Sequence, residues 1–314
     1  MHKRLVNHCT LDFSIRPVGP LLVKSGKEGA DPTKPDMEFV ETYHAGGRSV
    51  YLPGSSLKGA IRAHAERIVR TVGGDKPPSE GKSGLWANDP VNDKYTYLQK
   101  KTAPEIYRQS SFTDQIFGNT SLASRLRIED AYPSSEHPLK LEERNGVAID
   151  RVFGSVVKGG LFNYQVCTDG EFRTKIHLKN FTLAQLALMG LVLRDLDQGW
   201  FGLGFGKSRG LGTVEVRYNS ASVSYPGCIL DQGKIKLLGS NKSWTINKLL
   251  GAGEFIENNP YQFPQDDEVI VPVGAKEMDL GFGVQLTWEG AEQVKDIFIK
   301  AMPKWCELLG GVAA

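Results

Sequence analysis

A glycine-rich segment at residues 199–212 is the feature that most limits how this chain can fold. Six of its fourteen residues are glycine, and Lys207 and Arg209 are its only charged residues. Such a composition supplies no side-chain core. Glycine lets the backbone approach a ligand closely and adopt positive φ, and successive backbone N–H groups in such turns form concave anion sites. The segment predicts a phosphate-binding loop, with a wide, mobile glycine connection as the alternative.

The elements on either side of the segment decide which kind of phosphate it suits. Residues 182–196 carry apolar residues at helical spacing, and Thr182 with Gln185 fits a capping box at the start of a helix. Residues 212–218 alternate like a strand. A mononucleotide P-loop has the opposite order, a strand followed by a helix, and the position of its first glycine is Phe201 here. The pattern therefore favours a nucleic-acid backbone over ATP.

A second basic motif lies at residues 51–62, which read Tyr-Leu-Pro-Gly-Ser-Ser-Leu-Lys-Gly-Ala-Ile-Arg. The Pro-Gly pair predicts a turn, and Ser55 or Ser56 is expected to cap a helix over residues 55–72. Lys58 and Arg62 lie four residues apart on that helix, near an N-terminus suited to phosphate. An ordinary capped amphipathic helix with a solvated charged face is the alternative.

Net charge is weakly informative, but its distribution supports a nucleic-acid partner. The whole chain carries only +2, whereas residues 1–218 hold 30 basic and 24 acidic residues. The four cysteines are far apart and form no zinc pattern, as expected for reduced thiols in a cytoplasmic protein. No apolar run is long enough to suggest a membrane span.

The periodic segments predict an α+β protein with a ferredoxin-like, RRM-like core and an antiparallel sheet. Strands are expected at residues 7–18, 124–131 and 212–218, and residues 161–167 and 171–178 are expected to pair as a hairpin. The core is assigned to residues 1–218, with insertions near 73–110 and 132–160. Residues 219–314 form a C-terminal extension, in which Pro303 is expected to break or kink a helix.

Several motifs in order resemble the RAMP superfamily. They are the residue 52–62 motif, Phe117-Gly118, the stretches 146–151 and 160–162, and the glycine-rich segment. More closely, residues 7–218 resemble the backbone RNA-binding subunits of type III CRISPR–Cas effector complexes. The resemblance implies copies of the chain stacked along a guide RNA beside other subunits. It also implies an inserted hairpin, the thumb, over residues 143–162, whose apolar wedge would be Val152, Phe153, Val156 and Val157; a core hairpin is the alternative.

The resemblance also implies where target RNA is cut. Family members that cleave use one aspartate in the loop before the Pro-Gly-Ser-Ser motif, and by distance from Pro53 the match is Asp36, with Asp31 second. Such a carboxylate would hold Mg²⁺ or another divalent cation, making the chain a metal-dependent endoribonuclease within the complex. A solvated loop carboxylate is the alternative.

The candidate residues form two further groups. Those expected to contact RNA are Lys24, Ser55, Ser56, Lys58, Arg62, Arg151, Lys207, Ser208 and Arg209. Those expected to shape the loop are Gly202, Gly204, Gly206, Gly210 and Gly212. Two other functions stay open: a guide-binding subunit without cleavage, and a guide-processing endoribonuclease with His44 or His64 as general base. The expected partners are guide RNA, complementary target RNA, further copies and other subunits, but no membrane.

Overall fold

The order of strands and helices predicted for the core is present in the computed structural model, which describes residues 3–26, 35–77, 84–91 and 95–310. The six core elements are β1 (His8–Pro17), α1 (Gly54–Val72), β4 (Leu126–Ile128), β8 (Phe172–Lys179), α4 (Leu183–Asp197) and β9 (Val214–Tyr225). The strands lie in the order β9, β1, β8, β4 and pair antiparallel. This βαββαβ order confirms the ferredoxin-like core.

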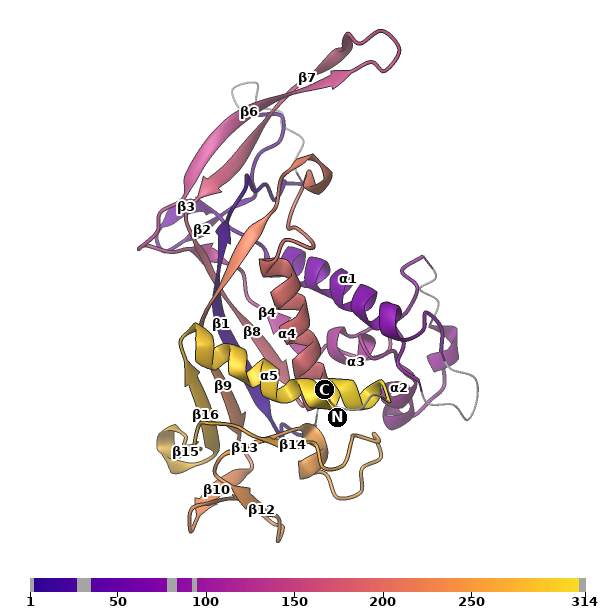
Figure 1. Cartoon of the computed structure of the whole chain (residues 1–314), viewed down its shortest axis with the longest axis vertical. Helices are drawn as coiled ribbons and strands as arrows, with labels where there is room; N and C mark the ends of the chain where they lie inside the picture. Colours follow the sequence, from indigo (N-terminus) through magenta and orange to yellow (C-terminus); the bar gives the residue numbers. More distant parts are fainter. Residues whose placement is uncertain (1–2, 27–34, 78–83, 92–94, 311–314) are drawn as a thin grey trace.

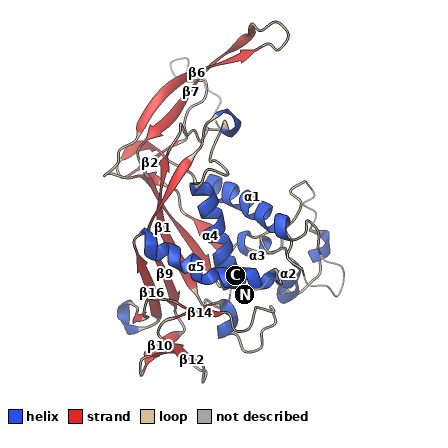
Figure 2. Ribbon diagram, in the orientation of Figure 1, coloured by secondary structure: helices blue, strands red, loops and turns tan. Residues whose placement is uncertain are grey.

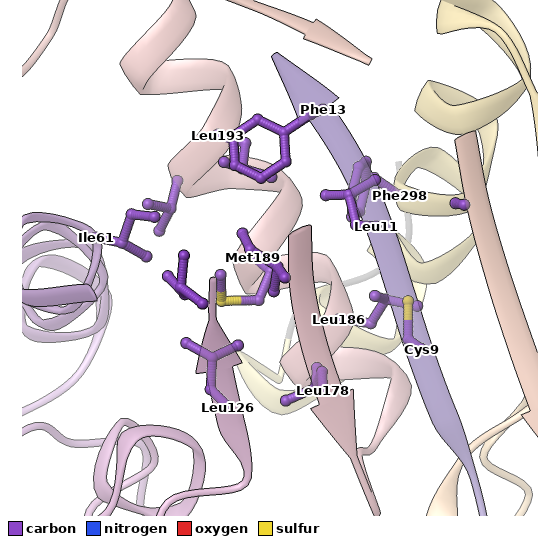
Figure 3. Close-up of a cluster of buried hydrophobic side chains, with 14 of the residues drawn as sticks. Cys9, Leu11, Phe13, Ile61, Leu126, Leu178, Leu186, Met189, Leu193 and Phe298 are labelled. Atoms are coloured by element: carbon purple, nitrogen blue, oxygen red, sulfur yellow. The ribbon is translucent and has the colours of Figure 1, made fainter. Parts of the chain in front are cut away.

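The main core lies between the sheet and the two helices α1 and α4. Residues at alternate positions of β1, including Leu11 and Phe13, are buried. They lie near Leu186 and Leu193 of α4 (Figure 3). The other face of β1 is polar, as expected for an antiparallel sheet covered by helices on one side. The capping box of Thr182 and Gln185 at the start of α4 is also confirmed.

A long hairpin projects from one end of the molecule (Figures 1 and 2). It consists of β6 (Lys140–Ile149) and β7 (Val156–Asp169), which pair with each other. The predicted hairpin of residues 161–167 with 171–178 is therefore wrong. The chain does turn at Gly170, where φ is +106°, but β8 pairs with β1, so the turn joins two strands with different partners.

The chain after residue 218 extends this core. Strand β9 continues to Tyr225, β16 (Val284–Glu289) pairs with it, and β15 (Lys276–Glu277) pairs with β16 at the edge of the sheet. Helix α5 (Ala291–Leu308) packs on α4, where a side chain at Gly190 would lie within 2.6 Å of Phe298. The predicted break at Pro303 is absent, because α5 continues through it.

Smaller elements complete the described part of the chain. The short strands are β2 (Glu41–His44), β3 (Gly47–Val50), β5 (Tyr132–Pro133), β10 (Cys228–Asp231), β11 (Lys234–Leu237), β12 (Ser243–Thr245), β13 (Lys248–Leu250), β14 (Glu268–Ile270) and β15 (Lys276–Glu277). The short helices are α2 (Ala103–Gln109) and α3 (Asp114–Phe117), with 3₁₀ turns η1 (Thr96–Leu98), η2 (Lys207–Arg209), η3 (Ala252–Phe255) and η4 (Asp279–Gly281). Among the described residues, none of the helices has the length and hydropathy needed to cross a bilayer.

Asp267 ties the C-terminal part of the chain to α4. Its carboxylate is 1% exposed and accepts hydrogen bonds from the Leu183 N–H at the start of the helix. Burial raises its pKa from 3.8 to about 7. The folded state therefore binds more protons than the unfolded state between these two values, so this carboxyl makes the protein less stable as pH rises from 3.8 to about 7.

The substitution Asp267→Asn is expected to remove this pH dependence, because the amide oxygen can still accept from Leu183 and carries no charge. The free energy of unfolding of the variant, relative to the unmodified protein, should rise between pH 4 and pH 7 by at most ~4 kcal/mol. Denaturant unfolding across that range measures the difference. Parallel profiles for the two proteins would contradict the assignment.

Candidate nucleic-acid interface

The glycine-rich segment joins α4 to β9 at the end of the molecule from which the β6–β7 hairpin projects (Figure 1). It is a fixed loop and not an open connection. Phe205 N–H donates to Leu22 O at 2.7 Å, and Gly212 N–H donates to Pro20 O at 2.8 Å. Leu203 and Leu211 are buried in the core, contrary to the expectation that the segment contributes no core. The loop is thus anchored to the residues that follow β1.

The glycines of the loop serve two purposes. A Cβ at Gly204 would lie 2.2 Å from Leu22 O, and one at Gly212 would lie 2.1 Å from Leu203 O, so close backbone packing requires both. Gly202 likewise packs against the backbone of Gly212, at 2.9 Å. Gly206 and Gly210 instead flank η2 with φ of +71° and +82°, a left-handed conformation that glycine adopts without strain. The glycines therefore position the short turn that carries the cations.

The tip of the loop presents Lys207, Ser208 and Arg209 to solvent. The Arg209 guanidinium lies 4.8 Å from the centre of the Phe205 ring, which supports the side chain without neutralising it. Within the described ranges, neither Lys207 nor Arg209 forms an ion pair. Lys24 is also exposed, two residues after the Leu22 carbonyl that holds the loop. Three of the predicted RNA-binding cations thus gather at this end of the protein.

The start of α1 differs from the prediction. No side chain at the N-cap closes the helix, so the expected serine cap is wrong. Instead the Gly54 N–H donates to Asp130 Oδ1 at 2.7 Å. Ser55 and Ser56 lie in the first turn and are exposed. Their hydroxyls are therefore available to a ligand at the helix N-terminus.

The two cations of α1 that were predicted to bind RNA, Lys58 and Arg62, point into the protein. Lys58 Nζ donates to Ser124 Oγ at 2.7 Å, and burial lowers its pKa. The Arg62 guanidinium bonds to Glu66 and Asp114 and donates to the Gly118 carbonyl. Both charges are thus bonded to groups of the protein itself, and their contact with RNA stays a prediction.

His64 lies on a different face of α1 and supports the glycine-rich loop. Its Nε2 lies 2.7 Å from Asp195 Oδ2 of α4, and its ring stacks on Phe201 with centroids 4.3 Å apart. At 100° per residue it is about 200° around the helix from Arg62. Because the ring is buried, it is poorly placed to be a general base for RNA. His44 is exposed and stacks on Tyr132 at 3.6 Å.

The apex of the β6–β7 hairpin is apolar and open to solvent. Val152 and Phe153 are 82% and 83% exposed, and Val156 and Val157 beside them are also exposed. Arg151 lies next to them and is exposed as well. Such side chains gain no stability in the isolated chain. They are suited to contact another molecule, and the alternative of a core hairpin is excluded.

Asp36 lies against the middle of β7 in this hairpin, and Asp31 lies outside the described residues. The Asp36 N–H donates to Asn163 Oδ1 at 2.7 Å, and its Oδ2 accepts from the Asn163 N–H at 2.9 Å. The side chain is exposed. Among the described residues, no three His, Cys, Asp or Glu side chains lie together as a metal site. Mg²⁺, however, commonly takes only one or two carboxylates and fills its shell with phosphate oxygens and water, so an exposed carboxylate beside bound RNA fits that ion.

These features all lie within one match to a known protein family. The family model of the RAMP superfamily matches residues 14–215. The chain belongs to the RAMP superfamily. The match spans β1, α1, the β6–β7 hairpin, α4 and the glycine-rich loop. No curated protein matches the chain. Membership of the RAMP superfamily indicates a CRISPR-associated, RNA-binding function.

Two polar residues of this RAMP protein were missed by reasoning from the sequence. Asp130 caps α1 from a position 76 residues along the chain, and Asn163 holds Asp36 from 127 residues away. Neither belongs to a local pattern. Asn163 directly follows the Gly160–Phe162 motif, which is the only hint that the sequence offers.

Proposed function

We propose that this RAMP protein is a guide-RNA-binding backbone subunit of a type III CRISPR–Cas effector complex. The observation that carries the proposal is the anchored glycine-rich loop with its exposed Lys207, Ser208 and Arg209. Exposed cations and turn N–H groups recognise a phosphate backbone without reading its sequence. The exposed hydrophobic apex of the β6–β7 hairpin supports a role as a wedge between nucleotides, beside neighbouring copies and other subunits.

The uncovered face of the sheet is a less suitable RNA surface. RRM modules stack bases on aromatic side chains of that face. Here Asp12 lies at its centre, and Arg173 makes two hydrogen bonds to it at 2.9 and 3.0 Å. Glu129 likewise bonds to His177 at 2.8 Å. Because these side chains are already bonded to each other, the loop end of the protein is the better site.

RNA binding through the loop is tested by salt dependence. The double substitution Lys207→Ala with Arg209→Ala should weaken binding of single-stranded RNA and lower the magnitude of the slope of log K against log salt by about 1.4, since each phosphate contact contributes about 0.7 for single strands. Filter binding across a salt series measures the slope. Lys295→Ala with Lys300→Ala on α5 makes the same change in charge and is the control. An unaltered slope in the loop variant would contradict the proposal.

We further propose that Asp36 supports cleavage of complementary target RNA with a divalent cation. A ribose 2′-oxygen can attack the adjacent phosphorus at a displaced nucleotide. Its proton passes to solvent, the bond to the 5′-oxygen breaks, and that oxygen takes up a proton, leaving a 2′,3′-cyclic phosphate and a 5′-hydroxyl. Bound Mg²⁺ would stabilise the charge on the phosphate. The chain itself holds the Asp36 carboxylate against the middle of β7, in the hairpin that is expected to displace a nucleotide.

The two remaining functions are separated by experiments on the same protein. A subunit without cleavage would bind guide and target RNA and leave the target intact. A guide-processing enzyme would cut repeat RNA without metal, and the burial of His64 argues against it. Incubation of the isolated protein with repeat RNA, with and without a chelator, tests that function.

A further inference from the structure

Asn163 connects Asp36 to the β6–β7 hairpin through two hydrogen bonds. Its side-chain Oδ1 accepts from the Asp36 N–H at 2.7 Å, and its own N–H donates to Asp36 Oδ2 at 2.9 Å. The first bond fixes the backbone of Asp36 and the second fixes its carboxylate. Asp36 therefore cannot leave β7 without losing both.

The residues after Asp36 continue this attachment. The Met37 N–H donates to Asn163 O at 3.2 Å, and the Gln165 N–H donates to Met37 O at 3.0 Å. Met37 and Tyr164 form a parallel β-bridge. Residues 36 and 37 thus lie along β7 like a short additional strand, and a displacement of β7 carries them with it.

Asn163 also reaches the other strand of the hairpin. Its Nδ2 donates to Glu143 Oε1 of β6 at 2.8 Å. An amide presents one acceptor and one donor group in a fixed plane. With its nitrogen held by Glu143, its oxygen is turned to the Asp36 N–H. The orientation of the Asn163 amide therefore depends on the positions of both strands of the hairpin.

We infer that Asn163 is a positioning residue that makes the Asp36 carboxylate follow the placement of the β6–β7 hairpin. Cleavage is then regulated by the hairpin: the carboxylate reaches its working position only when the hairpin is seated against RNA. This consequence for cleavage rests on the proposed function of Asp36. The attachment itself does not, and it is measured separately.

Hydrogen exchange tests the attachment in the full-length chain without RNA. Asn163→Ala removes the side-chain acceptor, so exchange of the peptide covering residues 35–40 should become about tenfold faster through local opening. Asn145→Ala is the matched control, because Asn145 faces Asn163 across the β6–β7 ladder and its side chain bonds to no described residue. The control should exchange like the unmodified protein. If this peptide exchanges in the Asn163→Ala variant at the same rate as in the unmodified protein, the inference is overturned.

Target cleavage by the assembled complex tests the consequence. Asn163→Ala should slow single-turnover cleavage by roughly 10- to 100-fold with target affinity unchanged, because a small misplacement of a reacting group has effects of that size. Asn163→Asp should also be slow, since it sets a carboxylate against Glu143. Combining it with Glu143→Gln exchanges donor and acceptor between the two side chains and should restore most of the rate. A purely structural role would not give this pattern of rescue.

The outcomes separate the inference from the proposed function. If Asp36→Ala stops cleavage and Asn163→Ala does not slow it, the regulatory inference is overturned and the function of Asp36 stands. If Asp36→Ala leaves cleavage unchanged, the cleavage proposal fails and takes the regulatory consequence with it. The attachment of Asp36 to the hairpin is then still decided by the exchange measurement.

Discussion

Replacing Asp36 with alanine is expected to stop cleavage of complementary target RNA by the assembled complex while target binding is kept. The side chain is exposed and contributes little to folding, so the guide-binding surface should remain intact. Loss of a carboxylate that holds a catalytic cation removes several kcal/mol of transition-state stabilisation, which corresponds to a rate loss of about a thousandfold. Single-turnover cleavage and target binding, measured on the same preparation, give the two quantities.

The controls for Asp36 separate charge from geometry. Asp36→Asn keeps an acceptor for the Asn163 N–H and removes only the charge, so it should be nearly as inactive as alanine. Asp75→Asn changes an exposed loop carboxylate with no hydrogen bond to the described residues and should have full activity. Activity lost in Asp31→Ala instead would transfer the role to Asp31. Full cleavage with both aspartates replaced would leave guide binding as the function.

The substitution Gly212→Ala is expected to have the largest effect on stability. The added Cβ would lie 2.1 Å from Leu203 O, and the backbone φ is +88°. It would also disturb the bond from the Leu203 N–H to Gly212 O, 2.9 Å long, that closes the loop. Forced overpacking and left-handed strain together are expected to destabilise the protein by about 3–5 kcal/mol. The midpoint temperature of thermal unfolding should fall, and the affinity for single-stranded RNA should decrease.

Gly210→Ala is the matched control for this clash. Gly210 has a similar φ of +82°, but an added Cβ would meet nothing within 4 Å. Gly210→Ala should therefore destabilise the protein only through left-handed strain, by about 1–2 kcal/mol. The difference between the two variants isolates the backbone contact. Equal stabilities would show that the loop relaxes around residue 212 and that its backbone contact with Leu203 does not anchor it.

Local patterns predicted the core elements well. Alternation marked β1, helical spacing marked α1 and α4, and the Thr182–Gln185 capping box set the start of α4. These features depend on residues a few positions apart. The order of elements then restricted the topology to few arrangements, which is why the ferredoxin-like core followed.

Features that depend on distant residues were not predictable in this way. The turn at Gly170 predicted that the strands on either side of it pair with each other. In the structure the strand before the turn, β7, pairs with β6, and the strand after it, β8, pairs with β1. A serine was expected to cap α1, yet Asp130 reaches the Gly54 N–H from elsewhere in the chain. Nothing local shows that Lys58 and Arg62 turn toward buried acceptors, because their spacing also fits a solvated face.

Position Asn163 shows the same limit at the candidate site. The sequence placed Asp36 in a loop and the hairpin about a hundred residues later, with no signal that they meet. Their contact combines a backbone pairing of Met37 beside β7 with two hydrogen bonds between Asp36 and Asn163. A single sequence contains no local pattern that predicts contact between residues so far apart, whereas the structure shows the contact directly.

The central strand of the sheet has a consequence for synthesis of the chain. Both neighbours of β1 come late: β8 begins at Phe172 and β9 at Val214. During translation both edges of β1 therefore stay unpaired until β8 has left the ribosome, which is more than half of the polypeptide, and one edge stays unpaired until β9 follows, after more than two-thirds of it. Pairing across such separations is slow and exposes the nascent chain to aggregation. Slower translation at low temperature, or a chaperone that shields the first strand, should raise the yield of soluble protein.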